Sequence, residues 1–312
     1  MSAVVVEQLV VRRGATVAVD NVSFQVVEGG GYGLLGTNGS GKSSLLKTLA
    51  TLLRPSSGRA LVCGRDVVED TLGVRRVVGY VPEEVGVYRG LSVWQHLEFL
   101  ARCRGLDRAE REETIETLLQ VVDLYDARHE EASALSRGLR RRLALAGALV
   151  HSPRVLLIED PFAELDSRAR LEIVEVLREL RTMGTTLVVA SNHPDDLLQV
   201  CTDVAILDRG RLLWSGPASA VPALWGLPAS WVMVQVLEEV DRAVDVLGAA
   251  PEVTDLVAEG ETLTFQFGGD DRRLAELLRR LVEQGVLVAS FHREPPDVDR
   301  VLASLGRASG AA

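Results

Sequence analysis

From residue 36 to residue 43 the chain reads Gly36-Thr37-Asn38-Gly39-Ser40-Gly41-Lys42-Ser43. This stretch matches the pattern G-x-x-x-x-G-K-S/T at every fixed position. The glycines let the backbone curl so that successive N–H groups point at an anion, and the lysine adds a positive charge. The closing serine offers a hydroxyl to Mg²⁺. The stretch therefore predicts a phosphate-binding loop, and the alternative is a chance glycine-rich turn.

The residues on either side of this phosphate loop fit the prediction. Gly33 to Leu35 is typical of a strand end, and Ser44 to Leu49 is typical of the helix that follows. The N-terminus of such a helix presents free N–H groups and the positive end of its dipole to an anion. We therefore expect Gly36 to Ser44 to bind a nucleotide and Ser43 to be a ligand of Mg²⁺, although the loop alone does not say which nucleotide is bound.

The composition excludes several classes of protein. The chain has 312 residues, of which 47% are hydrophobic, and a net charge of −10, which argues against nucleic acid as a partner. Cys63, Cys103 and Cys201 are far apart in the sequence and fit a reducing compartment. Met1 to Glu7 lack the basic region of a signal peptide, and no apolar run is long enough for a transmembrane helix. We expect any membrane role to depend on a partner.

The order of predicted elements indicates an α/β protein with a helical insert. Short strands are predicted at 4–6, 17–19 and 22–27. Residues 90–150 are mostly helical, with Ser92 at an N-cap position. The apolar runs 155–158 and 185–190 predict strands that are buried on both faces. Between them Leu171, Val174, Leu177 and Leu180 form a helical stripe. Residues 204–207 and 211–214 predict a hairpin.

The C-terminal part has a different texture. Strands are predicted at 231–237, 253–258, 262–267 and 286–292, and helices at 240–247 and 274–281. This order is β-α-β-β-α-β, which is ferredoxin-like. We therefore expect one domain over 1–220 and an α+β accessory domain over 228–312. A structural role as a dimerising cap is favoured over a ligand sensor, because no polar cluster in this part indicates a site.

Three later segments narrow the kind of nucleotide protein. They are Leu135-Ser136-Arg137-Gly138-Leu139 at a helix start, Glu159-Asp160-Pro161 followed by Glu164-Leu165-Asp166, and Ser191-Asn192-His193 after a strand. In this order they resemble the ATP-binding subunit of ABC transporters over about residues 1–220. The extension that ends near Pro295 is similar to that of bacterial ABC-2-type exporter ATPases of the drug- and sodium-efflux subfamily. The resemblance implies a P-loop NTPase with a RecA-like core, an antiparallel β subdomain and a helical subdomain.

The resemblance also implies roles for single residues. It makes Glu159, Asp160 and His193 catalytic, and it gives Mg²⁺ the ligands Ser43, Glu83 and Glu159. Ser136, Arg137, Gly138 and Asp166 would contact ATP that is bound to a second subunit. The implied assembly is an ATP-sandwiched dimer. The alternatives are an ordinary capped helix start at residues 135–139 and a surface loop histidine at His193.

The chain departs from the family pattern at several positions. The usual Asp-Glu pair is inverted to Glu159-Asp160, which leaves the water-polarising carboxylate one methylene short. We therefore hypothesise that the chain binds MgATP well but hydrolyses it slowly. Glu83 replaces a glutamine, and Arg13 stands where an aromatic residue stacks on adenine. A guanidinium can also stack on a base, although Arg13 could instead be a solvent-exposed side chain. Arg137 and Leu139 replace a glycine and a glutamine of the signature.

Three functions compete. The first is an ATPase subunit that drives a separate membrane permease, most consistent with an exporter, as a homodimer or paired with another ATPase subunit. It would lie on the cytoplasmic face of the cell membrane, with the surface near Glu84 to Leu91 taking a coupling helix. The second is an ATP-gated regulatory subunit with little turnover, which the carboxylate inversion favours. The third is an ABC protein of translation or DNA repair, which the acidic charge and the missing second domain or long coiled coil disfavour.

Overall fold

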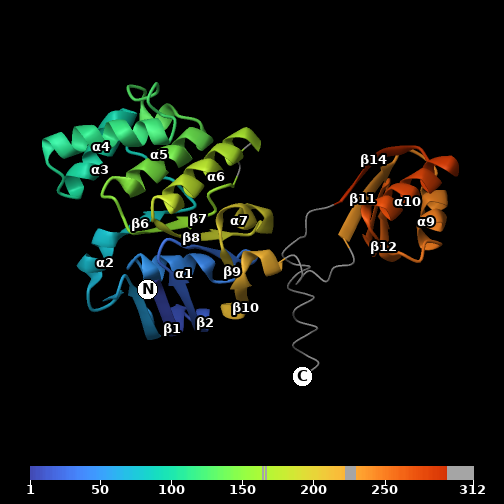
Figure 1. Ribbon diagram of the computed structural model, residues 1–312, viewed down its shortest axis with the longest axis horizontal. Coiled ribbons are helices and arrows are strands. Elements are labelled where there is room, and N and C mark those ends of the chain that lie inside the picture. Colours follow the sequence, from blue (N-terminus) through green and yellow to red (C-terminus); the bar gives the residue numbers. More distant parts are fainter. Residues whose placement is uncertain (164, 166, 222–229, 294–312) are drawn as a thin grey trace. The chain divides into compact units, whose positions relative to one another are not determined.

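A computed structural model describes residues 1–163, 165, 167–221 and 230–293 of the chain (Figure 1). The chain divides into two compact units, Met1–Ser219 and Ala220–Ala312. Each unit has its own cluster of buried apolar side chains. The phosphate loop belongs to the first unit.

A six-stranded sheet forms the centre of the first unit. Its order is β10-β9-β3-β8-β7-β6, and its strands are β3 (Gly31–Leu35), β6 (Val78–Val81), β7 (Val155–Glu159), β8 (Thr186–Ser191), β9 (Asp203–Asp208) and β10 (Arg211–Pro217). All neighbours are parallel except β9 and β10, which form the predicted hairpin. Every residue of β3, β7 and β8 is buried. Continuous apolar strands of this kind belong to parallel sheets that are covered on both faces.

A second, antiparallel sheet has the order β2-β1-β4-β5. Its strands are β1 (Ser2–Arg13), β2 (Thr16–Val27), β4 (Ser57–Val62) and β5 (Arg65–Asp66). The prediction of separate strands at 17–19 and 22–27 is wrong, because β2 runs through both. Asn21 absorbs the irregularity with a φ of 53°, a left-handed conformation that asparagine adopts more easily than most residues.

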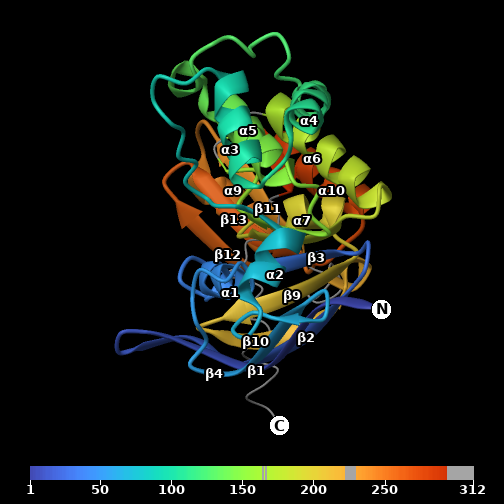
Figure 2. The same cartoon turned by 90° about the vertical axis from the view of Figure 1, so that its left-hand side faces the viewer.

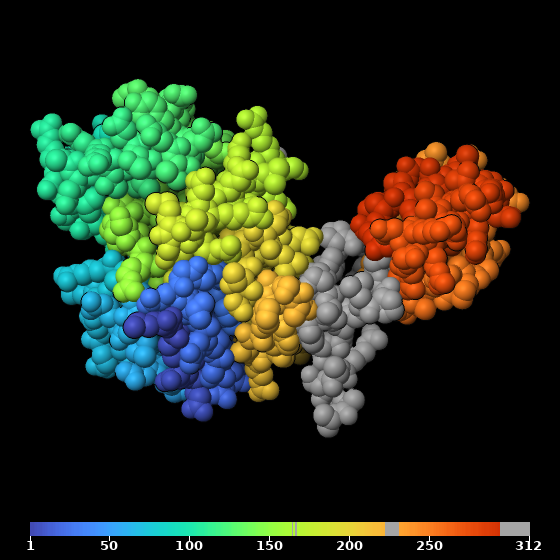
Figure 3. Space-filling view, in the orientation of Figure 1, coloured from blue at the N-terminus to red at the C-terminus, as the bar shows by residue number. Residues whose placement is uncertain are grey.

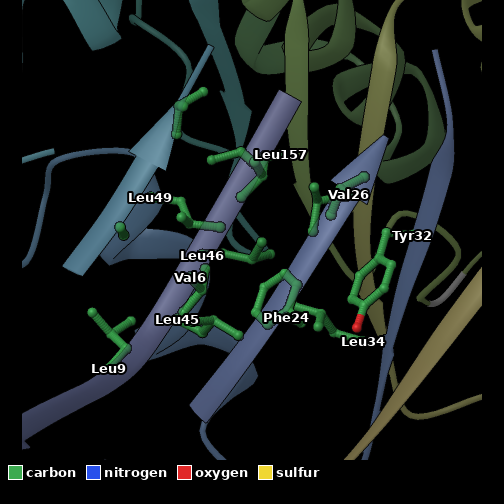
Figure 4. Packing of buried hydrophobic residues seen from close by; sticks show 14 of the residues in the cluster. Val6, Leu9, Phe24, Val26, Tyr32, Leu34, Leu45, Leu46, Leu49 and Leu157 are labelled. Atoms are coloured by element: carbon green, nitrogen blue, oxygen red, sulfur yellow. The ribbon is translucent and has the colours of Figure 1, made fainter. Parts of the chain in front are cut away.

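Helix α1 (Lys42–Leu49) packs between the two sheets (Figure 4). Its Leu45, Leu46 and Leu49 are fully buried against Val6 and Phe24 of the antiparallel sheet and against apolar residues of the parallel sheet. Truncating one such leucine to alanine costs about 2–5 kcal/mol of unfolding free energy. The helix that follows the phosphate loop is therefore held firmly from both sides.

The predicted helical insert consists of α3 (Val93–Cys103), α4 (Arg108–Val121), the short η1 (Ala132–Ala134) and α5 (Arg137–Leu149). It forms the green and teal part of the surface in Figure 3, and Figure 2 shows it on the opposite side of the first unit from β1 and β2. Ser92 caps α3 as predicted, within a capping box that Gln95 completes. The remaining α-helices described in this unit are α2 (Thr71–Val77), α6 (Ser167–Thr182) and α7 (Pro194–Val200), and a second short 3-10 helix, η2 (Ala218–Ala220), follows β10.

Helix α6 covers one face of the sheet with a stripe that differs from the predicted one. Val174, Leu177 and Leu180 are buried as expected, but the side chain of Leu171 is 58% exposed and Ile173 is buried instead. The helix rotates so that Ile173 rather than Leu171 continues the apolar face, since residues three and four apart share a face and Ile173 lies four before Leu177.

The second unit has the predicted β-α-β-β-α-β order. Its elements are β11 (Ser230–Val236), α9 (Val240–Gly248), β12 (Val253–Glu259), β13 (Thr262–Phe267), α10 (Asp271–Glu283), β14 (Val288–Arg293). The antiparallel sheet has the order β12-β13-β11-β14. Leu263, Phe265 and Phe267 of β13 are buried in one core with Leu247 and Leu281 of the two helices. The segment near Pro295 lies outside the described residues.

Candidate functional site

The predicted site segments follow four neighbouring parallel strands. β3, β8, β7 and β6 are consecutive neighbours in the sheet, and the last three are labelled in Figure 1. The phosphate loop follows β3, His193 follows β8, Asp160 follows β7, and Glu83 follows β6. The carboxyl ends of parallel strands share one edge, and ligands of open α/β sheets bind at that edge. The sheet therefore brings together segments that are far apart in the sequence.

The phosphate loop is shaped by close backbone contacts that admit only glycine. Gly41 has a φ of 106°, and a Cβ atom there would lie 2.3 Å from the carbonyl oxygen of Ala18. At Gly36 a Cβ atom would lie 2.4 Å from the carbonyl oxygen of Leu207. These contacts come from β2 and β9, which are secured in different sheets. The chain itself thus fixes the curved backbone on which the N–H groups of an anion site depend.

Lys42 begins α1 and folds back over the loop. Its ammonium nitrogen donates to the carbonyl oxygens of Gly36 at 2.7 Å and Thr37 at 2.9 Å. Burial lowers the pKa of this ammonium group, and nearby carboxylates oppose that shift. These carboxylates belong to Asp160, Glu83 and Glu159. These three predicted acidic residues therefore lie within electrostatic reach of the loop lysine.

Glu159 ends β7 and is almost fully buried, with 3% of its surface exposed. Its Oε1 accepts a 2.6 Å hydrogen bond from the hydroxyl of Tyr80 on the neighbouring strand β6. The same oxygen lies 4.0 Å from the ammonium nitrogen of Lys47 on α1. Burial and the Glu159 carboxylate raise the pKa of the Tyr80 phenol. The phenol therefore stays protonated and can donate to the carboxylate.

Asp160 lies in a different environment from its neighbour. Its φ is 39°, in the left-handed region that aspartate tolerates better than most residues. Its amide donates to the carbonyl oxygen of Ala190 on β8 at 2.8 Å, and it is only partly buried. The chain therefore turns out of the sheet at Asp160. The two adjacent acidic residues therefore differ, because Glu159 is buried and hydrogen-bonded whereas Asp160 is only partly buried.

His193 stands at the N-cap of α7, and its amide donates to the Ser191 hydroxyl at 3.0 Å. One turn further on, the side chain of Asp196 is fully buried and pairs with Arg170 of α6 at 3.1 Å. Its second oxygen, Oδ2, has no hydrogen-bond partner among the described residues. Burial raises the pKa of Asp196, while Arg170 and His193 lower it. This ion pair ties the helix that carries His193 to α6.

The oxygen donors at this edge suit Mg²⁺ only together with a phosphate ligand. Mg²⁺ takes octahedral oxygen ligands, keeps several waters and is usually bound by one or two protein groups plus substrate phosphates. The described residues contain no group of three or more His, Cys, Asp or Glu side chains that could hold a metal ion. Ser43 lies at the start of α1, and Glu159 and Glu83 are close enough to Lys42 to affect its pKa. These few oxygen donors fit a site in which the protein and the phosphates of a nucleotide bind Mg²⁺ together.

The start of α5 is organised differently. Ser136 is the N-cap, and its hydroxyl accepts the amide of Leu139 at 3.3 Å, with Arg137 as the first helical residue. A Cβ atom on Gly138 would make only ordinary contact, 3.5 Å from a methyl group of Leu165. Nothing in the described part of the chain therefore requires a glycine at this position.

The structure says less about two other predicted nucleotide contacts, Arg13 and Asp166. Arg13 lies at the exposed end of β1, where it pairs with Thr16 across the hairpin to β2. This position is compatible with either predicted reading of Arg13, as a base-stacking residue or as a solvent-exposed one. Asp166 lies outside the described residues.

Sequence reasoning assigned no role to several side chains that contact the site residues. They are Tyr80 and Lys47 beside Glu159, Arg170 and Asp196 near His193, and Arg141 of α5, which donates to the carbonyl oxygen of Glu159 at 3.2 Å. Each contact joins residues that are distant in sequence and depends on the strand or helix order. For Tyr80, the sequence offers one signal of a role at the site, which is a hydroxyl-bearing side chain in a short apolar strand just before Glu83.

Comparisons with known proteins point to the same kind of protein as this site geometry. The family described as ABC transporter matches residues 19–163 of the chain. The daunorubicin/doxorubicin resistance ATP-binding protein DrrA of Streptomyces peucetius is 31% identical over 295 residues, which cover 93% of this chain and 88% of DrrA. The chain belongs to the ABC transporter family of ATP-binding proteins. The Nod factor export ATP-binding protein I of Cupriavidus metallidurans is 32% identical to this ABC protein over 294 residues, covering 94% of it and 93% of the relative.

Solved structures agree with this family membership. The structure of cbiO1 from Clostridium perfringens, part of the ABC transporter complex cbiONQ, matches with a TM-score of 0.66 and 28% identity over 71% of this chain and 91% of cbiO1. These findings confirm the P-loop NTPase fold and ATP as the ligand of this ABC transporter subunit, and they do not favour the regulatory alternative. None of the helices in the described ranges has the length and apolar character needed to cross a bilayer.

Proposed function

We propose that this ABC protein is the ATP-hydrolysing subunit of an exporter and drives a separate membrane permease through ATP-dependent dimerisation. The observation that carries the proposal is the convergence of the phosphate loop, Glu83, Asp160 and His193 on one sheet edge. The similarity to a drug-resistance protein and an export protein over nearly the whole chain supports the direction of transport. The protein would lie on the cytoplasmic face of the cell membrane, held there by its permease.

Within one subunit, the chain's own groups perform most of the chemistry. The N–H groups of the phosphate loop hold the β- and γ-phosphates, and Lys42 exchanges the carbonyl oxygens of Gly36 and Thr37 for phosphate oxygens. Asp160 orients and polarises the attacking water, and His193 donates to the γ-phosphate. Ser43, Glu83 and Glu159 are the residues that would hold Mg²⁺. When bound, Mg²⁺ offsets negative charge on the phosphate oxygens.

The second half of the site comes from another subunit, in the simplest case a second copy of this chain. Ser136, Arg137 and Gly138 present the N-terminus of α5, which is suited to an anion because the positive end of the helix dipole lies there. Asp166 contributes at the same interface. The glycine at position 138 then serves a close approach by the other subunit's ATP, since nothing described in its own chain requires it. The accessory domain over 228–312 acts as a dimerising cap.

We further propose that hydrolysis is slow because Asp160 is one methylene short of its water. A misplaced general base loses part of the roughly 10²–10⁴-fold that such a group contributes. The test is the steady-state ATPase rate of wild type, Asp160→Glu and the swap Glu159→Asp/Asp160→Glu. We expect each change to raise kcat by about tenfold, whereas Asp160→Asn abolishes turnover. If neither carboxylate change raises kcat, the proposal of a retracted base is wrong.

The permease has a suitable docking place on the first unit. A groove of about 720 Å³ lies between the sheet and the helical insert, lined by Val85, Val87, Tyr88 and Leu100 and flanked by Arg75 and Arg104. Tyr88 is 51% exposed and packs edge-on against Phe99. Neither arginine forms an ion pair with a described residue. The groove therefore suits a short amphipathic helix that carries a carboxylate next to its apolar face.

The test of this docking place first identifies the permease that co-purifies with the chain. The two proteins are then co-expressed, and the amount of the subunit recovered with membranes is measured. We expect Tyr88→Asp to release the subunit from membranes, because a buried unpaired charge opposes docking. Leu213→Asp on β10 is the matched control, since Leu213 is also exposed, at 41%, but is far from the groove in the fold. Equal membrane recovery of the two variants would place the permease elsewhere.

A further inference from the structure

The carboxylate of Glu159 is held at one of its two oxygens. Tyr80 donates to Oε1 at 2.6 Å, and the ammonium nitrogen of Lys47 lies 4.0 Å from the same oxygen. Glu159 is 3% exposed, so water does not compete strongly for this contact. A hydrogen bond to a buried charge is among the stronger ones in proteins.

The strand register explains why Tyr80 reaches this carboxylate. Tyr80 of β6 lies opposite Leu157 of β7, and residues two apart in a strand point to the same face. Glu159 therefore shares the face of Leu157, whose side chain packs in the cluster that surrounds α1 (Figure 4). Since Ser43 is the second residue of α1, Glu159 and Tyr80 both face the helix that carries the expected metal ligand.

The contact depends on the length of the glutamate. An aspartate at position 159 would withdraw the carboxylate by about 1.5 Å, the length of one carbon–carbon bond. The 2.6 Å contact would then open to a separation that no longer counts as a hydrogen bond. The inverted order thus places the longer side chain, Glu159, at the position expected to bind the metal. Its carboxylate reaches the Tyr80 hydroxyl, which an aspartate carboxylate at this position would not reach.

We propose that Tyr80 is a positioning residue for Mg²⁺-dependent nucleotide binding. Its hydroxyl, with Lys47, holds Oε1 of Glu159 so that the other carboxylate oxygen faces the metal side of the phosphate loop. Groups that orient a metal-binding carboxylate in this way typically contribute 10–100-fold to metal affinity. This inference rests on the proposed Mg²⁺-nucleotide site.

The test measures how much Mg²⁺ tightens nucleotide binding rather than turnover. The ratio of the Kd for the fluorescent analogue MANT-ATP in EDTA to its Kd in Mg²⁺ is compared among variants of the full chain. We expect Tyr80→Phe to lower this ratio about tenfold while leaving the Kd in EDTA unchanged. In the Glu159→Asp background, Tyr80→Phe should have no further effect, because the hydroxyl has already lost its partner.

Tyr32→Phe is the matched control. Tyr32 is a buried tyrosine of the same sheet, and its hydroxyl bonds to the Ser215 hydroxyl at 2.7 Å. This variant loses the same kind of group and should keep the wild-type ratio. An unchanged ratio in Tyr80→Phe, or an equal drop with and without Glu159→Asp, would overturn the inference. If the wild-type chain itself showed no Mg²⁺-dependent binding, the proposed metal site rather than the role of Tyr80 would be wrong.

Discussion

Two helix starts in the first unit carry glycines, and their surroundings differ. At the phosphate loop, a Cβ atom on Gly41 would meet the Ala18 carbonyl oxygen at 2.3 Å, and the loop lysine is bound to two carbonyl oxygens of its own chain. At the start of α5, a Cβ atom on Gly138 would have its nearest neighbour at an ordinary 3.5 Å. The first start is thus determined by contacts within the chain. The second has room that its own described chain leaves unused, which is what a half-site completed by another subunit requires.

The substitution Gly138→Asp is expected to have the largest effect, and it tests whether the start of α5 serves the ATP of another subunit. A carboxylate at the start of α5 would repel the phosphates of the other subunit's ATP and block its approach. We expect the ATPase rate to fall about 10²–10³-fold, while the Kd for MANT-ATP and the melting temperature stay at wild-type values. Gly138→Ala is the milder control. A comparable loss of MANT-ATP binding by the isolated subunit would instead place α5 at its own ATP.

The next effect concerns the stability of the phosphate loop. Gly41→Ala should lower the unfolding free energy by about 1–3 kcal/mol from backbone strain alone, with a further cost from the Ala18 contact, and should weaken MANT-ATP binding. Gly39→Ala is a matched control, because Gly39 also has a positive φ, 81°, but nothing lies within 4 Å of its Cβ position. Urea unfolding of both variants measures the difference. Equal destabilisation would show that the Ala18 contact does not shape the loop.

The same contrast explains how far the sequence alone reaches. The phosphate loop, the cap at Ser92 and the order of the second unit are local patterns, and the sequence predicts them because neighbouring residues determine each one. The shared sheet edge follows from parallel strands. In contrast, the Tyr80–Glu159 and Arg170–Asp196 contacts join distant segments. Only the strand and helix packing brings those partners together, so no spacing in the sequence could indicate them.

Two errors have the same origin. The apolar runs 17–19 and 22–27 predict two separate strands, but pairing with β1 keeps β2 continuous through Asp20 and Asn21. Leu171 fits the helical period of α6 and is nevertheless exposed, because the packing of the helix on the sheet selects Ile173. In both places the tertiary neighbours overrule a local preference.

The smallest predicted effect concerns the pH dependence of folding stability. It tests whether this dependence comes from the sheet edge that carries the site or from His151, which lies at the other end of β6. Burial and Arg104 lower the pKa of His151 from 6.5 to about 4 in the folded chain, and its Nε2 contacts the carbonyl oxygen of Val78 at 3.0 Å. Between these pH values the unfolded chain binds a proton that the folded chain does not. Stability contributed by the neutral imidazole is therefore present above pH 6.5 and is lost as the pH falls toward 4.

His151→Gln removes this titration, so its melting temperature should fall less than that of wild type between pH 7 and pH 5, by about 2 °C or more. ATPase activity measured over the same range reports the site edge separately. Identical pH dependence of the two melting temperatures would assign the stability change to other groups.

The central claim is that each ATP site combines the phosphate loop of one subunit with the start of α5 from a second copy. Mixing two inactive variants, Lys42→Ala and Gly138→Asp, tests it most directly. In a mixed dimer, the loop of the Gly138→Asp chain meets the intact α5 of the Lys42→Ala chain and forms one complete site. We predict that ATPase activity returns on mixing to roughly a quarter of the wild-type rate, because half of randomly formed dimers are mixed and each has one of two sites. Activity that stays at the level of the separate variants would contradict the claim.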